Sequence, residues 1–139
     1  MTKVTFVENW KRSIQPRKQR KYLYNAPLHV RQKLMHAHLS PELRKKYHRR
    51  SWQLRAGDKV KVTTGQFKKK EGEVQHIDLK LGRVVVSNVE YFKKDGSKTP
   101  IPLRPSNLMI VNLNLDDKKR KQHLESLGKA TPVTKKEKK

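Results

Sequence analysis

The sequence predicts a mainly β fold with short helices, in which a small five-stranded barrel carries basic extensions at both ends. Short β-type segments follow one another from residue 58 to residue 111, with turn signals between them. Helix-start signals precede them, and Lys and Arg outnumber Asp and Glu by 35 to 12, for a net charge of +23. We expect a basic extended arm (1–24), a short helical basic platform (25–50), the barrel (51–112), and a weak helix with a basic tail (113–139).

The arm is the most cationic part, since residues 1–50 carry a net charge of +12, about half of the total. Residues 10–21 read WKRSIQPRKQRK and show no apolar periodicity. We therefore expect this segment to be extended and to take a fixed path only against phosphate.

Two short helices are expected in the platform. The first has Pro27 at its first position, which suits a helix start, and places apolar residues at helical spacing up to Leu39. The second combines Ser40, Pro41 and Glu42 as N-cap, first helical residue and first-turn acid, and should run to about Tyr47. Because a single acid lies among their basic residues, phosphate contact is favoured over a merely solvated helix face.

Five short strands are expected at residues 58–63, 73–77, 83–87, 98–102 and 107–111. The first alternates, with Val60 and Val62 on one face and lysines on the other, as in a half-buried strand. The third is apolar at consecutive positions and is expected to be central. Asp95–Gly96 predicts a hairpin-like turn. Strands this short favour a small barrel over alternating strand–helix units.

The C-terminal segment after Asp116–Asp117 reads KKRKQHLESL and is compatible with a short helix whose leading acids suit the helix dipole. The tail GKATPVTKKEKK has little apolar content, so we expect it to be disordered in isolation.

Composition argues against several classes of protein. The apolar fraction is 33%, below the roughly 45–50% usual for globular chains. There is no Cys, hence no disulfide or thiolate metal site. The longest apolar run is four residues, where a spanning helix needs about 20, and no signal peptide is visible. The six histidines show no metal-ligand spacing, and no nucleophile or phosphate-loop motif occurs. We expect a soluble intracellular protein that is not an enzyme, without metal, cofactor, small-molecule substrate or membrane insertion.

Residues 58–86 resemble the KOW motif, which consists of a strand, a Gly, a Lys-rich loop, a second Gly followed by an apolar residue, and a strand. Gly65 permits a positive φ or a close approach to phosphate, and Gly72 stands where a side chain would crowd the strand. The sequence departs from the commonest form because Lys69 or Lys70 occupies the place of a frequent extra Gly. The resemblance implies an SH3-like barrel in a ribosomal or transcription protein. The matching positions are Val60, Val62, Gly65, Lys68, Lys70, Gly72, Val74 and Val86.

Residues 20–120 are similar to a whole family, the universal ribosomal proteins twenty-four of the large subunit, called twenty-six in eukaryotes. This resemblance implies a structural constituent of the large subunit in the cytoplasm that binds large-subunit ribosomal RNA and contacts neighbouring large-subunit proteins. It also implies early assembly and a position near the peptide exit tunnel. The pieces that match are Asn25–Pro27, Leu39–Arg44, Tyr47, Arg50–Ser51, the KOW segment, Pro105–Asn107 and Leu115–Asp116.

Cationic side chains bind RNA by displacing counterions from phosphates, and aromatic rings bind it by stacking on unpaired bases. Trp10, Tyr22, Tyr24 and Trp52 are candidates for stacking, with packing favoured for Trp52, and Phe67 is expected to pack on the barrel rather than stack. The candidate RNA-binding residues are Lys11, Arg12, Arg17, Lys18, Arg20, Lys21, Tyr22, Arg31, Lys33, Arg44, Lys45, Arg49, Arg50, Gly65, Gln66, Lys68, Lys69, Lys70, Gly72, Lys93, Lys94, Arg104, Ser106, Asn107, Lys118 and Arg120.

Two alternative functions stay open at this point. One is a KOW-containing transcription elongation or antitermination factor, although such factors usually add a separate α/β domain for which this chain is too short and too basic. The other is a general nucleic-acid-binding or chromosome-binding protein. An anionic membrane surface is a weaker alternative partner for so basic a chain.

Overall fold

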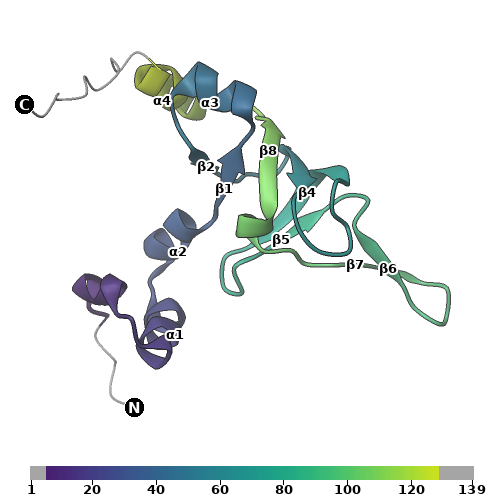
Figure 1. The fold of residues 1–139 in the computed structure, drawn as a ribbon, viewed down its shortest axis with the longest axis horizontal. Coiled ribbons are helices and arrows are strands. Elements are labelled where there is room, and N and C mark those ends of the chain that lie inside the picture. Colours follow the sequence, from purple (N-terminus) through teal and green to yellow (C-terminus); the bar gives the residue numbers. More distant parts are fainter. Residues whose placement is uncertain (1–5, 129–139) are drawn as a thin grey trace, which may run out of the picture.

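A computed structural model gives the fold of residues 6–128. Figure 1 shows three parts: a helical arm at the N-terminal end, a twisted sheet at the centre, and a β hairpin that projects from the sheet on the side away from the arm. Two further helices lie together beside one end of the sheet. The chain is a mixed α and β protein with one multistranded sheet and several helices.

The arm consists of a 3₁₀ helix η1 (Glu8–Arg12) and the α-helices α1 (Pro16–Asn25) and α2 (Leu28–Leu34). The prediction of an extended segment over residues 10–21 is therefore wrong. Pro16 occupies the first turn of α1, and Arg, Lys, Gln and Leu, which follow it, are good helix formers. No residue of α1 is buried, so this helix needs no apolar face and left no periodic signal in the sequence.

The first platform helix is shorter than predicted, because residues after Leu34 form the strand β1 (His36–Leu39). In β1 the side chains of Ala37 and Leu39 are buried and those of His36 and His38 are on the outer face. The two histidines thus share one face of a strand, whereas a helix would have separated them. Met35 and Leu39 do reach the core, as their apolar character suggested, but by the alternation of a strand.

The second platform helix is confirmed as α3 (Pro41–Tyr47). The Ser40 hydroxyl accepts a hydrogen bond from the backbone N–H of Leu43 at 3.3 Å, which satisfies one of the free donors of the first turn. His48 ends the helix in a left-handed conformation with φ of 51°, and the chain then reverses into the strand β2 (Ser51–Gln53).

The sheet has six strands in the order β2-β1-β8-β3-β4-β5. Four predicted strands appear in it as β3 (Lys59–Val62), β4 (Glu71–Asp78), β5 (Arg83–Val86) and β8 (Leu108–Asn112). β8 pairs parallel with β1 and antiparallel with β3. Within residues 6–128 the end strands β2 and β5 do not pair with each other, so the predicted closed five-stranded barrel is not formed there.

The third predicted strand, β5, lies at an end of this sheet rather than at its centre. Its apolar composition has another cause. Val84 exchanges two backbone hydrogen bonds of 2.8 Å with Leu103, so an irregular segment covers the outer edge of β5.

The predicted strand at residues 98–102 belongs to the projecting hairpin, in which β6 (Glu90–Phe92) pairs with β7 (Lys98–Pro100). Its turn is the one expected at Asp95–Gly96. Gly96 has a φ of 81°, and the Asp95 carboxylate accepts the backbone N–H of Ser97 at 2.9 Å.

Most core residues lie on the strands or directly beside them, with Tyr47 added from α3 and Leu124 from the helix α4 (Lys118–Gly128). This last helix confirms the predicted C-terminal helix. Leu39, Val60, Leu108 and Ile110 are fully buried at the centre of the core, and Leu124 seals it from α4. The tail predicted to be disordered lies, apart from Gly128, outside the described residues. Across the described part of the chain, no helix is long and apolar enough to cross a membrane.

Candidate RNA-binding surface

The loop between β3 and β4 carries the three lysines of the KOW-like segment. Backbone hydrogen bonds from Lys68 to Gly65 (3.1 Å), from Lys69 to Val62 (2.9 Å) and from Lys70 to Phe67 (3.1 Å) fold the loop tightly. All three lysine side chains are exposed, as is Gln66. The structure thus presents three exposed lysine side chains on one compact turn, and their contact with phosphate stays a prediction.

Two glycines set the shape of this loop in different ways. Gly65 has a φ of 91° with open space where a Cβ would stand, so the residue is required by conformation alone. Gly72 lies against the neighbouring strand, where a Cβ would come within 2.3 Å of the Ser87 carbonyl oxygen and 2.8 Å of a Val86 methyl. The expectation that a side chain would crowd the strand at Gly72 is confirmed.

Lys69 has a φ of 74°, a left-handed conformation that L residues rarely adopt. The chain therefore needs a glycine-like conformation where a second glycine is frequent in the motif, and it supplies that conformation with a lysine. Phe67 is half-buried and packs against the core, and the Lys70 ammonium lies 5.0 Å from its ring centre. Phe67 therefore has a packing role, as expected.

The helix α3 carries a second group of cations. Arg44, Lys45 and Lys46 occupy its last turn, and Arg49 and Arg50 follow the reversal at His48. Lys45, Arg49 and Arg50 are exposed. Arg44 is half-buried, because its Nε donates to the Leu39 carbonyl at 2.7 Å. Part of the Arg44 guanidinium therefore stabilises the start of α3.

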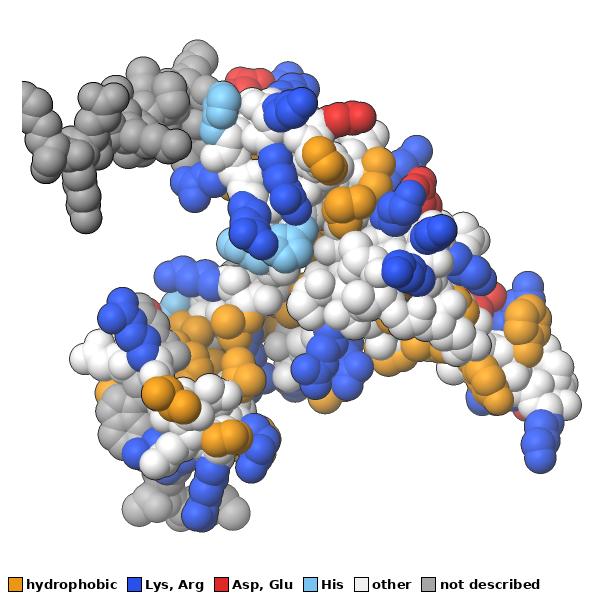
Figure 2. Space-filling view, viewed as in Figure 1, with side chains coloured by type: hydrophobic (Ala, Val, Ile, Leu, Met, Phe, Trp, Pro, Cys, Tyr) orange, Lys and Arg blue, Asp and Glu red, His pale blue; other side chains and the backbone are white. Residues whose placement is uncertain are grey.

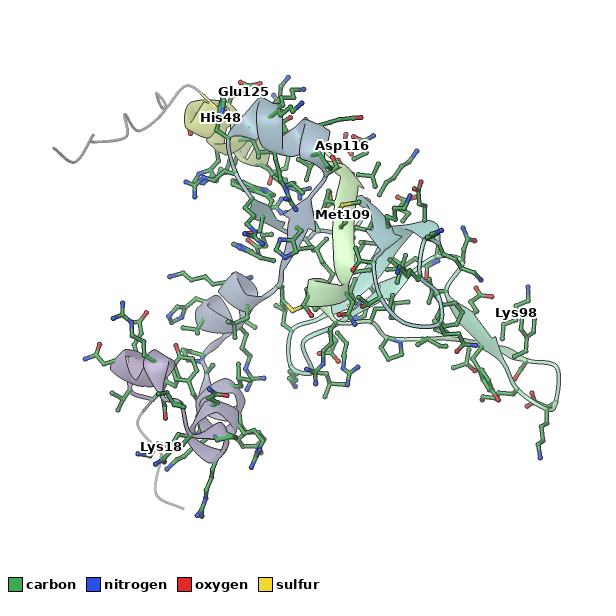
Figure 3. The ribbon with its side chains drawn as sticks, in the orientation of Figure 1. Lys18, His48, Lys98, Met109, Asp116 and Glu125 are labelled. Atoms are coloured by element: carbon green, nitrogen blue, oxygen red, sulfur yellow. The ribbon has the colours of Figure 1, made fainter. Side chains whose placement is uncertain are left out.

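The arm carries a third group, which lies on α1, α2 and their flanks. Arg12, Arg17, Lys18, Arg20, Lys21 and Lys33 are exposed, and Lys11 lies in η1. Figure 3 shows Lys18 on the arm and Lys98 on the hairpin at opposite ends of the molecule. Basic side chains therefore occur at both ends of the described fold.

Arg31 holds the arm in place. Its Nε donates to the Ala26 carbonyl at 2.8 Å, Nη1 donates to the Lys80 carbonyl at 3.1 Å, and Nη2 donates to the Tyr24 carbonyl. These bonds tie the end of α1 to the turn between β4 and β5. Each nitrogen atom of the Arg31 guanidinium donates to a backbone carbonyl, which gives this residue a structural role that the sequence did not reveal. Its contact with RNA stays a prediction.

Arg120 is the clear error among the predicted RNA-binding residues. Only 5% of it is exposed, and its guanidinium forms a two-point ion pair with the buried carboxylate of Asp58, at 2.7 and 2.8 Å. It also donates to the carbonyls of Asn114 and Gln53 at 2.8 and 3.0 Å. An arginine this deeply buried has no surface to offer a phosphate.

The remaining polar candidates lie on the hairpin, on η2 (Pro105–Asn107) and at the start of α4. Lys93, Lys94, Arg104, Ser106 and Lys118 are exposed. Asn107 is half-buried, and its backbone carbonyl accepts two hydrogen bonds from Thr63, at 2.9 Å from the amide and 3.0 Å from the hydroxyl. This contact joins η2 to the end of β3, directly before the lysine loop.

The aromatic candidates divide between packing and exposure. Trp52 packs against the core, as predicted, and its ring lies 5.3 Å from the imidazole of His123. Tyr22 is half-buried, with its ring 4.9 Å from that of Phe6. Tyr24 is 81% exposed and so is free to stack on a base.

Comparison with known proteins identifies the family of this chain. The profile of the family that comprises the eukaryotic ribosomal proteins L26 and their archaeal counterparts matches residues 13–126. The chain belongs to this family. A relative from Methanothrix thermoacetophila, named large ribosomal subunit protein uL24, is 54% identical over 110 residues, which cover 79% of this chain and 95% of the relative.

Two further relatives carry the same name. The one from Methanospirillum hungatei is 51% identical over 81% of this chain and 93% of its own length. The one from Methanosphaera stadtmanae is 48% identical over 81% of this chain and 96% of its own length. The match to the L26 family covers the arm from residue 13, the whole sheet and most of α4. It therefore covers nearly all of the described fold.

Sequence reasoning missed one part of the surface of this L26 family member. His36, Trp52, Arg55, Lys119 and His123 converge on a cavity of about 460 Å³ beside β2 and α4. Helical spacing gives a partial sign of this cavity in the sequence, because Lys119 and His123 are four residues apart and so share one face of a helix. In the structure that face is exposed, and the adjacent face holds the buried Arg120 and Leu124.

Electrostatics distinguish His36 in this cavity. Partial burial lowers the pKa of the His36 imidazole below its usual value of 6.5, so the ring is neutral at physiological pH. Among residues 6–128 no group of three or more His, Asp or Glu side chains is placed to hold a metal ion. Figure 2 shows many Lys and Arg side chains and few acidic ones on the visible face of the described part.

Proposed function

We propose that this chain is a structural constituent of the large ribosomal subunit, that it binds large-subunit ribosomal RNA, and that it works in the cytoplasm. The observation that carries the proposal is the family membership, with relatives named large ribosomal subunit protein uL24 along nearly their whole length. The alternative of a transcription factor is not favoured, because these relatives carry the name of a ribosomal protein.

The basic groups supply the mechanism of binding. Exposed cations on the arm, on α3, on the lysine loop and on the hairpin release counterions from phosphates, which gives a large and salt-dependent affinity. Phosphate contacts fix position, and RNA shape together with unpaired bases supplies specificity. The scarcity of acidic residues supports this assignment, since the sequence has 12 Asp and Glu residues against 35 Lys and Arg residues.

The finer part of the proposal concerns the fold and the neighbours. β3, the lysine loop and β4 form an SH3-like core of the KOW type, and the positions of Gly65 and Gly72 support this assignment. Exposed Leu23, Leu28 and Leu34 on the arm and Leu81 in the turn between β4 and β5 offer apolar contacts to neighbouring ribosomal proteins. Early assembly and a place near the peptide exit tunnel follow from the family resemblance.

Sedimentation tests the proposal directly. The native protein should travel with large ribosomal subunits through a sucrose gradient and stay with them after a high-salt wash. A chain recovered with RNA polymerase or with DNA, and absent from subunits, would contradict it and favour one of the two alternatives.

A further inference from the structure

A cavity lined by basic and aromatic residues lies next to α4, apart from the basic side chains of the arm and of the lysine loop. It measures about 460 Å³, within the range of small-ligand sites, and lies where β2 and the first turns of α4 meet. In Figure 2 a hollow between the α3–α4 end and the arm has Lys, Arg and His side chains on its wall. The lining residues that matter below are His36, Arg49, Trp52, Arg55, Lys119 and His123.

Two aromatic rings form one wall of the cavity. The Trp52 and His123 rings have centroids 5.3 Å apart and are tilted by 45°. Trp52 is anchored from behind, because it packs on the core and pairs with Ala37 of β1. A half-buried indole beside an exposed imidazole is the kind of surface on which proteins stack an unpaired base.

The charge of the cavity is cationic. No acidic residue lines it within the described part of the chain. Neither Arg49 nor Lys119 forms an ion pair with an acidic side chain within residues 6–128, while Arg55 pairs with Asp117. Two cations without acidic partners next to two aromatic rings suit a ligand that is both flat and anionic.

The floor of the cavity is rigid. Arg120 lies beneath it, fixed by the Asp58 carboxylate and by the Gln53 carbonyl. Its Nε is buried without a hydrogen-bond partner among the described residues. Because buried bonds hold this floor, the cavity exists before a ligand arrives, and less free energy is lost in ordering it on binding.

We propose that this cavity binds one unstacked nucleotide of an RNA strand, with its base against Trp52 and His123 and its phosphate at Arg49 and Lys119. The inference rests on the proposed function, since it names the kind of RNA element that this part of the surface takes. The neutral His36 imidazole both donates and accepts hydrogen bonds, so it suits the edge of a base better than a phosphate.

Fluorescence of Trp52 tests the proposal in the full chain. A Trp10→Phe variant leaves Trp52 as the sole indole, since the sequence has two Trp residues. The probes are AMP, UMP, ribose 5-phosphate, a single-stranded RNA trinucleotide and a short RNA duplex. The nucleotides should quench Trp52 saturably, ribose 5-phosphate should compete without quenching, and the trinucleotide should bind at least tenfold more tightly than AMP. The duplex, whose bases are stacked, should not quench.

Point variants locate the site. Arg49→Ala and His123→Ala, both at exposed side chains, should each weaken trinucleotide binding at least fivefold. Lys121→Ala removes an exposed charge from the same helix outside the cavity and should leave the affinity unchanged within twofold. An equal loss in Lys121→Ala would mean charge attraction alone and would overturn the proposal.

A parallel titration with large-subunit ribosomal RNA separates two kinds of failure. Absence of quenching by every nucleotide, with steep salt-dependent binding of the ribosomal RNA retained, would overturn the cavity and leave the proposed function standing. Absence of both would overturn the proposed function as well. AMP binding as tightly as the trinucleotide would also count against the proposal, because it would indicate a site for free nucleotides.

Discussion

Arg120 of α4 and Asp58, just before β3, form a fully buried ion pair between residues 62 positions apart in the chain. Each oxygen of the Asp58 carboxylate accepts two hydrogen bonds, since the backbone N–H groups of Asn114 and Arg55 also donate to them, at 2.9 and 2.8 Å. Four hydrogen bonds thus compensate the burial of one negative charge. The pair fixes α4 against the sheet.

Removing the Arg120 side chain should strongly destabilise the fold. In Arg120→Ala the Asp58 carboxylate stays buried with its backbone partners alone, which should cost about 3–5 kcal/mol of the free energy of unfolding. Urea denaturation followed by circular dichroism measures the loss. Lys121→Ala, at an exposed neighbour in the same helix, should change the stability by less than about 0.5 kcal/mol. Equal midpoints for wild type and Arg120→Ala would show that the pair does not hold α4.

Gly72→Ala should destabilise the sheet through a clash. Its Cβ would come within 2.3 Å of the Ser87 carbonyl oxygen, a backbone atom that cannot move without breaking the pairing of β4 with β5. We expect a loss of about 1–3 kcal/mol or more. Gly65→Ala is the comparison, since it has open space and should lose only about 1 kcal/mol from its positive φ. Similar melting temperatures for Gly72→Ala and wild type would contradict the packing argument.

Lys69 gives an opposite prediction, because it adopts a φ of 74°. Lys69→Gly should raise the free energy of unfolding by about 0.5–1 kcal/mol, as glycine accepts this conformation without the steric penalty. Lys69→Ala removes the same charge but keeps the penalty, so its stability should match that of wild type. Thermal unfolding at fixed ionic strength compares the three proteins, and a gain in both variants would assign the effect to charge instead.

Neutralising the lysine loop should reduce the salt dependence of RNA binding. With Lys68, Lys69 and Lys70 changed to Gln, the slope of log K against log salt should fall by about 2, since each phosphate contact contributes roughly 0.7–0.9. Filter binding at several salt concentrations gives the slope. A triple Gln variant of Lys59, Lys80 and Lys121, which are exposed and outside the predicted set, matches the change in charge and should keep a steeper slope. An unchanged slope in the loop variant would mean that the loop faces solvent.

Asp117 should make the stability of the fold fall in acid. Its hydrogen bond from Arg55, and then that from the Lys119 backbone N–H, lower the pKa of the Asp117 carboxyl below its usual 3.8. A lowered pKa in the folded state means that the stabilisation is complete above the unfolded value and is lost as the pH falls through the folded value. Asp117→Asn keeps a capping side chain but not the charge, so its urea midpoint should lie below that of wild type at pH 7. The two midpoints should converge as the pH falls through the lowered pKa of Asp117 in the folded state, and a constant difference would contradict the linkage.

Much of the fold could be predicted from local pattern. The alternation at Val60 and Val62 marked β3, and Ser40 with Pro41 marked the start of α3. Prediction failed where tertiary context decided the outcome: residues His36–Leu39 have helical spacing but pair with two strands, and α1 buries no residue that could reveal it. Charge alone cannot separate a cation that binds phosphate from one that neutralises a buried acid, which is why Arg120 was misassigned.

The parallel pairing of β1 with β8 has a consequence for the order in which the protein acquires its structure. β8 lies between β1 and β3, so the β1–β2 pair and the β3–β4–β5 group remain two unconnected pieces until the last strand has been synthesised. The cationic arm leaves the ribosome first, long before the strand that unites the sheet. The arm of a nascent chain can therefore bind RNA before the two parts of its sheet have paired. Pairing of β8 with β1 and β3 then stabilises the fold after that contact has formed.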